Sequence, residues 1–339
     1  MKVAPGPGHM ELRQIVEPTP GPGEVLIEVA ACGICGTDLH IEAGEYAAVT
    51  PVVLGHETAG RVAAVGAGVS RVALGDRVTT EPFYSLCGTC AFCQAGRPNL
   101  CPERRSIGTH VNGAFAPYVT IREGAVRVLA DSIDTRAAAM TEPVACCAHG
   151  ILELAQPQPG DVVVVSGPGP MGLAAAQVAR TAGTEVLLLG TSADERRLAI
   201  GGEVGIERLV DVEREDVDAV IARLTAGQGA PLVIECAGAG ASFDQCVRLA
   251  RRGGTLLMIG LYGPSVTVDL DSAIIKELRV LGSFGQVPSA WDLALDLMAA
   301  GTVQTAPLIT AELPLSRWEE GFAAARAKGE GKILLTPEG

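Results

Sequence analysis

The sequence lacks any apolar run that approaches the roughly 20 residues a helix needs to cross a bilayer. Its first residues, MKVAPGPGHMELRQIVEP, also lack the basic start and the apolar core of a secretory signal. Both a membrane anchor and export are therefore disfavoured. We expect a globular protein of the cytoplasm with no membrane partner.

A cluster of Lys and Arg is also missing, and the chain has 26 Lys and Arg against 39 Asp and Glu, a formal net charge of −13. Because such a surface repels a phosphate backbone, we exclude nucleic acid as an expected partner. Cysteine, in contrast, occurs ten times. Without an export signal these thiols stay reduced, so regularly spaced cysteines indicate metal sites before disulfides.

With 339 residues the chain exceeds what one hydrophobic core usually organises, so we expect two domains with a functional cleft between them. Up to about residue 150, strand-like segments such as VLIEVA and GRVAAVG alternate with Gly and Pro. From about residue 161, apolar runs alternate with Ala-rich helical stretches, which is typical of βαβ units and a parallel sheet. The sequence therefore predicts an α/β protein: a mostly β domain, a doubly wound domain, and a tail whose KILLTP segment rejoins the first domain.

Four cysteines recur at regular spacing in the segment CGTCAFCQAGRPNLC. They are Cys87, Cys90, Cys93 and Cys101, on a loop with Gly and Pro and almost no core of its own. Four thiolates complete a tetrahedral zinc shell and leave no position for substrate. We therefore predict a structural zinc that holds a loop that burial cannot stabilise. Free thiols in a surface loop are the weaker alternative.

A second set of metal ligands lies in the motifs CGICGTDLH and GHE. Cys35, His56 and Glu57 offer one thiolate, one imidazole and one carboxylate, which suits zinc with an open position. Such a zinc would act as a Lewis acid on an alcohol or carbonyl oxygen and lower the pKa of the alcohol. Glu142, in TEPVACC, offers a second carboxylate that would bind zinc directly or through water. Cys146 is a weaker rival ligand.

Polar residues near Cys35 predict supporting roles. Metal-bound histidine usually gives its second N–H to a carboxylate, and Asp38 is the candidate partner for His56. Thr37 offers a hydroxyl that could pass the substrate proton outward, and His40 could carry it to solvent. Taken singly, Thr37 and His40 would be ordinary loop residues. Their place beside the metal motif favours the catalytic interpretation.

The segment DVVVVSGPGPMGLAAAQVARTAG contains G-x-G-x-x-G directly after an apolar strand and at the start of a helix. The glycines are Gly167, Gly169 and Gly172, with Pro170 and Met171 between the last two. Glycine permits a tight turn and close approach of a pyrophosphate to the helix N-terminus, whose N–H groups favour anions. We therefore predict a dinucleotide site here.

The next strand, EVLLLG, ends at Gly190, where an Asp or Glu normally holds the adenosine ribose. Thr191, Ser192, Arg196 and Arg197 follow, and these side chains could accept the 2′-phosphate of NADP. The sequence therefore favours NADP over NAD. The alternative is that both arginines are solvated helix residues whose charge neighbouring acidic residues offset.

These motifs follow one another along the chain in the order typical of one family. Over essentially its whole length the chain resembles the zinc-containing medium-chain dehydrogenase/reductase family, particularly its sorbitol (polyol) and threonine dehydrogenase branch. VVLGHETAGRVAAVG, GDRV, EPVACCAHG and GKILLTP extend the likeness. The resemblance implies a GroES-like catalytic domain at 1–150, with the structural-zinc lobe at about 86–102. It implies a Rossmann domain at 151–285 and a C-terminal segment at 286–339 that completes the catalytic domain.

The resemblance also implies a catalytic zinc on Cys35, His56 and a carboxylate, with Glu57 and Glu142 both matching the polyol branch. The absent acid at Gly190 departs from the frequent NAD preference of the family. Further coenzyme contacts carried over from the family fall in three short segments. These are Cys236, Ala237 and Gly238 with Ser283, Phe284 and Gly285 along the nicotinamide, and Ile259, Gly260 and Leu261 near its ribose.

We therefore predict a zinc-dependent oxidoreductase that transfers a hydride between a secondary alcohol and NAD(P), with the substrate oxygen on the catalytic zinc. The expected substrate is a polyol, a sugar or an amino alcohol, and two zinc ions are expected per chain. An NADPH-driven ketone or aldehyde reductase with the same residues is the alternative, followed by a non-catalytic cofactor-binding protein. Family analogy implies a homo-oligomer, a dimer or a tetramer, built by edge pairing of Rossmann sheets.

Overall fold

The computed structural model describes residues 1–338, and the chain forms two compact units, each with its own large sheet. Unit 1 comprises residues 1–142, 309–327 and 332 onward, and unit 2 comprises residues 143–308 and 328–331. Among the described residues, no helix is both long and apolar enough to cross a membrane.

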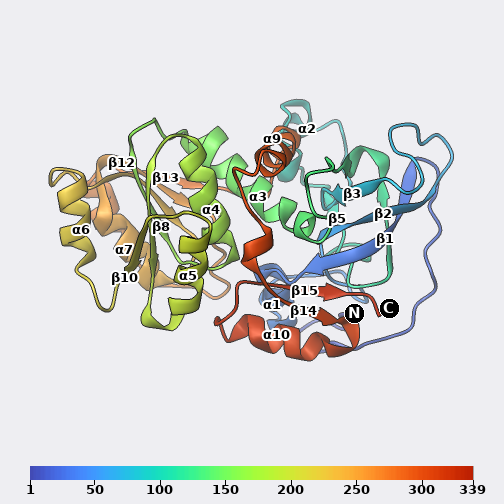
Figure 1. Ribbon diagram of the computed structural model, residues 1–339. Helices are drawn as coiled ribbons and strands as arrows, with labels where there is room; N and C mark the ends of the chain where they lie inside the picture. The colour runs from blue at the N-terminus through green and yellow to red at the C-terminus, as the bar shows by residue number, and fades with distance from the viewer. Residues whose placement is uncertain (339) are drawn as a thin grey trace. The chain divides into compact units, whose positions relative to one another are not determined.

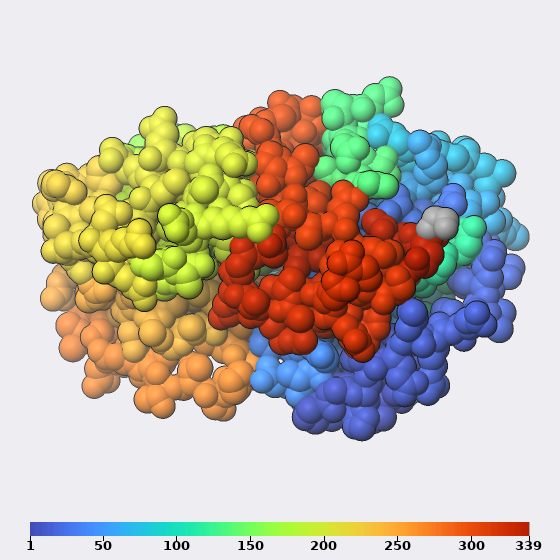
Figure 2. Space-filling model, turned by 60° about the horizontal axis from the view of Figure 1, so that its bottom comes forward, coloured from blue at the N-terminus to red at the C-terminus, as the bar shows by residue number. Residues whose placement is uncertain are grey.

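Unit 1 contains a seven-stranded sheet in the order β14-β15-β1-β2-β3-β7, with β6 also paired to β1. β15 runs antiparallel to β1 and parallel to β14, so the C-terminal part of the chain completes a sheet that the N-terminal part begins (Figure 1). In Figure 2, atoms of the C-terminal part (red) accordingly lie beside atoms of the N-terminal part (blue). A separate two-stranded sheet pairs β4 with β5. The strands are β1 (Glu24–Gly33), β2 (Glu57–Val65), β3 (Arg77–Thr80), β4 (Phe83–Ser85), β5 (Arg105–Ser106), β6 (Tyr118–Arg122), β7 (Val126–Val128), β14 (Ile309–Pro314) and β15 (Lys332–Thr336), and the helices are α1 (Gly36–Ala43), α2 (Ala91–Gln94) and α10 (Trp318–Arg326).

The alternation along β1 explains how this sheet makes its core. Val25, Ile27 and Val29 are at most 4% exposed and belong to one hydrophobic cluster, whereas Glu28 faces solvent. At the far end of the strand, Gly33 lies opposite Glu57 of β2. The register therefore brings the residues that follow β1 beside those that begin β2.

Unit 2 contains a six-stranded parallel sheet in the order β10-β9-β8-β11-β12-β13, which confirms the predicted doubly wound α/β fold. Figure 1 shows α4 and α5 on one side of this sheet and α6 and α7 on the other. The elements are α3 (Thr141–Ala148), β8 (Val162–Ser166), α4 (Pro170–Thr181), β9 (Glu185–Gly190), α5 (Glu195–Glu203), β10 (Arg208–Asp211), α6 (Val217–Leu224), β11 (Ala230–Glu235), α7 (Gly240–Leu249), β12 (Ala250–Met258), α8 (Leu270–Ile275), β13 (Arg279–Gly282) and α9 (Pro288–Ala299). α3 begins in unit 1 and continues into unit 2.

The strand β8 is buried along its whole length, as its unbroken apolar sequence predicts for a sheet covered on both faces. The strand order reverses beside it, because β9 and β10 lie on one side of β8 and β11 lies on the other. In open parallel sheets, ligands bind at the carboxyl ends of the strands at such a reversal. The return to unit 1 comes at Ile309, later than residue 286, because α9 packs on the helical turn His149–Ala155 of unit 2.

Candidate active site

The three ligands predicted for the catalytic zinc come together at one end of the β1–β2 pair. Cys35 follows β1 as the N-cap of α1, while His56 precedes β2 and Glu57 begins it. One ligand atom of each, the Cys35 Sγ, a ring nitrogen of His56 and a carboxylate oxygen of Glu57, lie within 4.8 Å of one another. A thiolate, an imidazole and a carboxylate at this spacing fit a zinc ion.

The surroundings of His56 favour a cation. Burial alone would lower the pKa of His56, but the Cys35 thiolate beside it and the charges of Asp38 and Glu142 raise that pKa well above its usual value. The His56 ring therefore lies in a strongly negative, buried environment. A bound metal ion would supply the positive charge that this environment attracts.

Asp38 lies close to His56, as predicted, but mainly caps the surrounding backbone. One carboxylate oxygen accepts a hydrogen bond from the Cys35 N–H at 2.9 Å, and the other accepts one from the Gly55 N–H at 3.4 Å. That second oxygen is 3.9 Å from the His56 Nδ1, an ion-pair contact rather than a hydrogen bond. Burial raises the pKa of Asp38, although His56 opposes this shift. Asp38 thus fixes the backbone that carries both ligands.

The two residues predicted to move the substrate proton lie on α1. The Thr37 hydroxyl is 3.7 Å from the Cys35 Sγ. His40 lies further along the helix, and its Nδ1 is 2.6 Å from a carboxylate oxygen of Glu45. The His40 side chain is 23% exposed, so it reaches solvent while Thr37 faces the ligand cluster.

Glu57 has a partner that sequence reasoning missed, the first residue of β15. The Lys332 Nζ donates to both carboxylate oxygens of Glu57, at 2.8 and 2.6 Å, and to the Ile34 carbonyl at 3.0 Å. The Lys332 side chain is 3% exposed and that of Glu57 1%, so the ion pair is fully buried. Burial alone would lower the pKa of Lys332, but Glu57, Cys35 and Glu142 together raise that pKa above its usual value. The GKILLTP motif carried this residue, but only as a marker of family likeness.

The ion pair requires glycine at residue 33. A Cβ added to Gly33 would lie 2.2 Å from a Glu57 carboxylate oxygen and 3.2 Å from the Lys332 Cδ. Any side chain there would displace the Glu57 carboxylate. The glycine of the CGIC motif therefore makes room for the carboxylate of a predicted zinc ligand.

Glu142 lies on the first turn of α3 and is 8% exposed. Its charge acts on both His56 and Lys332, but its carboxylate is not part of the group formed by Cys35, His56 and Glu57. Cys146, one helical turn later, donates from Sγ to the Gln286 side-chain oxygen at 3.3 Å and is likewise outside that group.

The four-cysteine lobe also folds around one metal-sized space. The sulfur atoms of Cys87, Cys90, Cys93 and Cys101 all lie within 4.8 Å of one another. The short helix α2 places the Cys93 N–H 3.5 Å from the Cys90 Sγ, and the Cys90 N–H is 3.3 Å from the Cys87 Sγ. Backbone N–H groups lower the pKa of the Cys87 thiol to about 6. This arrangement fits a closed zinc site with four thiolates.

The glycine motif forms a tight turn between β8 and α4. Gly167 has a φ of +96°, and a Cβ on Gly172 would lie 1.8 Å from the Gly167 carbonyl oxygen. Gly169 is the N-cap of α4, and a Cβ there would meet no atom within 4 Å. Pro170 and Met171 open the helix, and proline suits the first helical position because its missing N–H would have no partner within the helix. The turn therefore fits a pyrophosphate.

The other predicted coenzyme residues gather along the same carboxyl edge of the unit 2 sheet. A Cβ on Gly167 would meet the Ala237 Cβ at 2.9 Å, and one on Gly238 would meet the Leu261 carbonyl at 2.2 Å. Ser283, after β13, donates its N–H to Met258 at 2.9 Å. The chain thus brings together the segments Cys236–Ala237–Gly238, Ile259–Gly260–Leu261 and Ser283–Phe284–Gly285 next to the glycine turn.

Glu235 holds the backbone at this edge of the sheet, and the sequence analysis did not predict it. It ends β11, is fully buried, and accepts hydrogen bonds from the backbone N–H groups of Ala237 and Gly238 at 2.9 and 3.0 Å. The Ser242 hydroxyl donates to it at 2.8 Å. An acidic residue at the end of the apolar run PLVIE was the only available signal.

The residues predicted for the 2′-phosphate follow β9 as expected. Gly190 has little room for a side chain, because an added Cβ would lie 2.8 Å from the Pro168 Cγ of the glycine turn. An Asp at residue 190 would therefore require the Pro168 ring to shift. Thr191, Ser192, Arg196 and Arg197 each contact a carboxylate of the chain.

Known proteins match this chain over nearly its whole length. Family models match residues 21–131 (alcohol dehydrogenase GroES-like domain) and 170–300 (zinc-binding dehydrogenase). The chain is 40% identical to a sorbitol dehydrogenase of Halalkalibacterium halodurans, covering 99% of this chain and 98% of the relative. It is 38% identical to the D-arabitol-phosphate dehydrogenase of Enterococcus avium, covering 98% and 96%. A solved zinc-binding dehydrogenase of Sinorhizobium meliloti, bound to NADP, is 37% identical with a TM-score of 0.87, covering 96% of this chain and 95% of that one.

Proposed function

Since the chain belongs to the zinc-containing medium-chain dehydrogenase/reductase family, in its polyol and threonine dehydrogenase branch, we propose that it interconverts a secondary alcohol and its ketone with NAD(P). The expected substrate is a polyol, a sugar or an amino alcohol. The observation that carries the proposal is the group of Cys35, His56 and Glu57, whose ligand atoms surround one metal-sized space. A non-catalytic protein would have no need of such a buried, charged group.

Bound zinc would polarise the substrate oxygen, and the nicotinamide would accept or donate the hydride. Cys35, His56 and Glu57 would hold the metal, and Glu142 would provide a further carboxylate whose charge already acts on His56. Lys332 would keep the Glu57 carboxylate in place when the metal is absent.

The proton of the substrate hydroxyl would leave along α1. Thr37 lies beside Cys35, close enough for its hydroxyl to hold that proton. His40, half-buried and paired with Glu45, would exchange the proton with solvent. This path needs no residue beyond the first two turns of the helix.

We propose two zinc ions per chain, one in the Cys35–His56–Glu57 group and one in the four-cysteine lobe. Metal analysis of the purified protein tests this stoichiometry directly. Cys35→Ser should remove one equivalent of zinc and abolish hydride transfer. Cys32→Ala is the control, because Cys32 lies three residues upstream and outside the ligand group; this variant should keep both zinc ions and its hydride transfer. Because the lobe needs four reduced thiols, we also propose the cytoplasm as its compartment.

For the coenzyme, we propose NAD(P) with a preference for NADP. No carboxylate side chain ends β9, and Arg196 lies on the helix that follows, with 57% of its side chain exposed. The Sinorhizobium meliloti relative, bound to NADP, supports this choice. The preference is expected to be modest, because the arginine already has a carboxylate partner.

The function is tested by a panel of polyols, sugars, amino alcohols and simple secondary alcohols with zinc-loaded protein, supplied with NAD or NADP. The absorbance of the reduced coenzyme reports turnover. We expect zinc-dependent activity on at least one of these classes and none in Cys35→Ser. Absence of turnover by the wild-type protein with both coenzymes and every substrate class in the panel would overturn the proposal.

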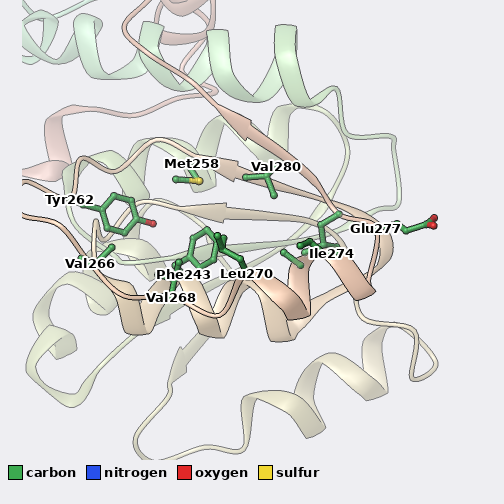
Figure 3. Close-up of a pocket in the computed structure, with 11 residues that line it drawn as sticks. Phe243, Met258, Tyr262, Val266, Val268, Leu270, Ile274, Glu277 and Val280 are labelled. Carbon is green, nitrogen blue, oxygen red and sulfur yellow. The ribbon is translucent and has the colours of Figure 1, made fainter.

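We also propose that a second copy of the chain covers the edge of the unit 2 sheet, which gives a dimer or a tetramer of such dimers. Among the described strands, β13 pairs only with β12, so its outer edge presents unpaired backbone groups. A pocket of about 510 Å³ lies between β12, β13, α7 and α8. Four of the apolar side chains that line it are exposed, and Figure 3 labels them. They are Val266, Leu270, Ile274 and Val280.

Light scattering after size exclusion tests this interface. The wild-type protein should have at least twice the chain mass of 34.8 kDa, and Val280→Lys should reduce it to that of one chain. Leu74→Lys is the matched control, because Leu74 is 68% exposed but lies in unit 1. A wild-type monomer, or an unchanged mass in Val280→Lys, would contradict the interface.

A further inference from the structure

The side chains expected to accept a 2′-phosphate are all engaged by carboxylates of the protein. The Thr191 hydroxyl donates to Asp194 at 2.8 Å, and the Ser192 hydroxyl donates to Asp211 at 2.7 Å. The adjoining backbone N–H of Ser192 also donates to a carboxylate, that of Glu213, at 3.1 Å. A coenzyme phosphate that binds here therefore competes with carboxylates of the protein for these donors.

The two arginines differ in how firmly they are held. Arg197 is 9% exposed, donates from Nε to the Glu330 carbonyl at 2.6 Å, and lies 3.4 Å from a carboxylate oxygen of Asp194. Arg196 is 57% exposed and pairs through one nitrogen with one oxygen of the Glu330 carboxylate. Arg197 is therefore fixed by main-chain and side-chain contacts, whereas Arg196 is held by a single exposed ion pair.

The Glu330 carboxylate is incompletely bonded. Its second oxygen is buried and has no hydrogen-bond partner among the described residues. A carboxylate that uses one oxygen binds an arginine less strongly than a two-oxygen fork, and a phosphate can offer such a fork with a larger charge. A phosphate dianion can therefore displace Glu330 from Arg196.

We propose that Glu330 competes with the 2′-phosphate of NADP for Arg196, and thereby limits the preference of this enzyme for NADP over NAD. This inference rests on the proposed function, since it presumes that a dinucleotide binds at the glycine turn. NAD, which has no 2′-phosphate, leaves the Arg196–Glu330 pair intact. NADP turns Arg196 away from Glu330, while the Glu330 carbonyl stays bonded to Arg197.

Glu330 lies in the segment 328–331, which packs with unit 2 although the chain on both sides of it belongs to unit 1. It is 134 residues from Arg196 along the chain, so the competing carboxylate comes from a part of the sequence far from the coenzyme motifs. The segment therefore acts as a specificity determinant that belongs to unit 2 but lies far along the chain from the coenzyme motifs.

Glu330→Gln tests the competition, because glutamine keeps the shape and the backbone carbonyl but removes the charge. Affinities for NAD and NADP are measured by titration calorimetry without substrate, so that turnover plays no part. The affinity for NADP should rise about tenfold, the factor that corresponds to roughly one charge-assisted hydrogen bond, and that for NAD should change less than about twofold. Glu185→Gln is the matched control: Glu185 also pairs with an exposed arginine, Arg208, but at the opposite end of β9.

Arg196→Met supplies a second variant that leaves Glu330 in place. It should lower the affinity for NADP about tenfold without affecting NAD, and Glu330→Gln should give no gain in its background. Equal NADP affinity in wild type and Glu330→Gln, with both coenzymes binding, would overturn this inference alone. Failure of the wild-type protein to bind either coenzyme would instead overturn the proposed function.

Discussion

Removal of the buried cation Lys332, next to the proposed zinc ligands, should make the protein depend on zinc for stability. Lys332→Met keeps the length of the side chain but leaves the Glu57 carboxylate, which is 1% exposed, without its bonds of 2.8 and 2.6 Å to Lys332. Breaking one half of a buried ion pair costs about 3–5 kcal/mol because an uncompensated charge remains. Zinc on Cys35, His56 and Glu57 would restore the lost positive charge. We therefore expect the free energy of unfolding of the metal-free variant to fall by most of this amount. That of the zinc-loaded variant should fall much less.

Urea denaturation followed by circular dichroism, with and without zinc, measures the effect. Lys2→Met is the matched control: Lys2 is 2% exposed but donates only to the backbone carbonyls of Gly6, Gly8 and Glu42. Removal of the Lys2 ammonium leaves these carbonyl groups without a donor but leaves no buried charge. The free energy of unfolding should fall by about 1–3 kcal/mol, and zinc should not restore it. If zinc stabilised the two variants equally, the electrostatic explanation of the Lys332–Glu57 pair would be wrong.

Three further predictions follow from local geometry. Gly33→Ala should lower zinc occupancy by one equivalent, because the new Cβ would lie 2.2 Å from the Glu57 carboxylate; full occupancy in metal analysis would contradict this. In chelator-treated protein, alkylation of Cys87 should accelerate as pH rises through about 6, since its pKa is lowered and the thiolate forms above that pH, and zinc should suppress the reaction. Gly172→Ala should reduce both thermal stability and coenzyme binding because its Cβ would lie 1.8 Å from a backbone oxygen, whereas Gly169→Ala, with no atom within 4 Å, should weaken only coenzyme binding. A stable Gly172→Ala protein would show that the turn can relax.

The parts of the site that sequence analysis predicted are those whose chemistry is local. The four-cysteine lobe brings its ligands together within 15 residues, and the glycine motif needs only a strand, a turn and a helix. Cys35 and the GHE motif are further apart, but the antiparallel pairing of β1 and β2 is enough to join them. Motif spacing and strand alternation contain this information.

The missed residues depend on tertiary structure. Lys332 and Glu57 are 275 residues apart and meet only because β15 joins the sheet beside β1. Glu330 reaches Arg196 for a similar reason, which no pattern near β9 could indicate. At Gly190 the sequence showed an absent carboxylate but not that the Pro168 ring lies 2.8 Å from where a Cβ would stand. Substitution by Asp at residue 190 would thus perturb the packing against the Pro168 ring as well as the coenzyme preference.

The place of β15 in the sheet affects the order in which the molecule can be completed during synthesis. All strands of the unit 2 sheet lie within residues 162–282 and are therefore synthesised before β14 and β15. Until β15 is made, β1 lacks this neighbouring strand, and the Glu57 carboxylate lacks Lys332, whose charge neutralises it. The sheet of unit 2 is therefore complete in the nascent chain while that of unit 1 is not, and completion of the proposed metal site becomes one of the last events in the folding of the chain.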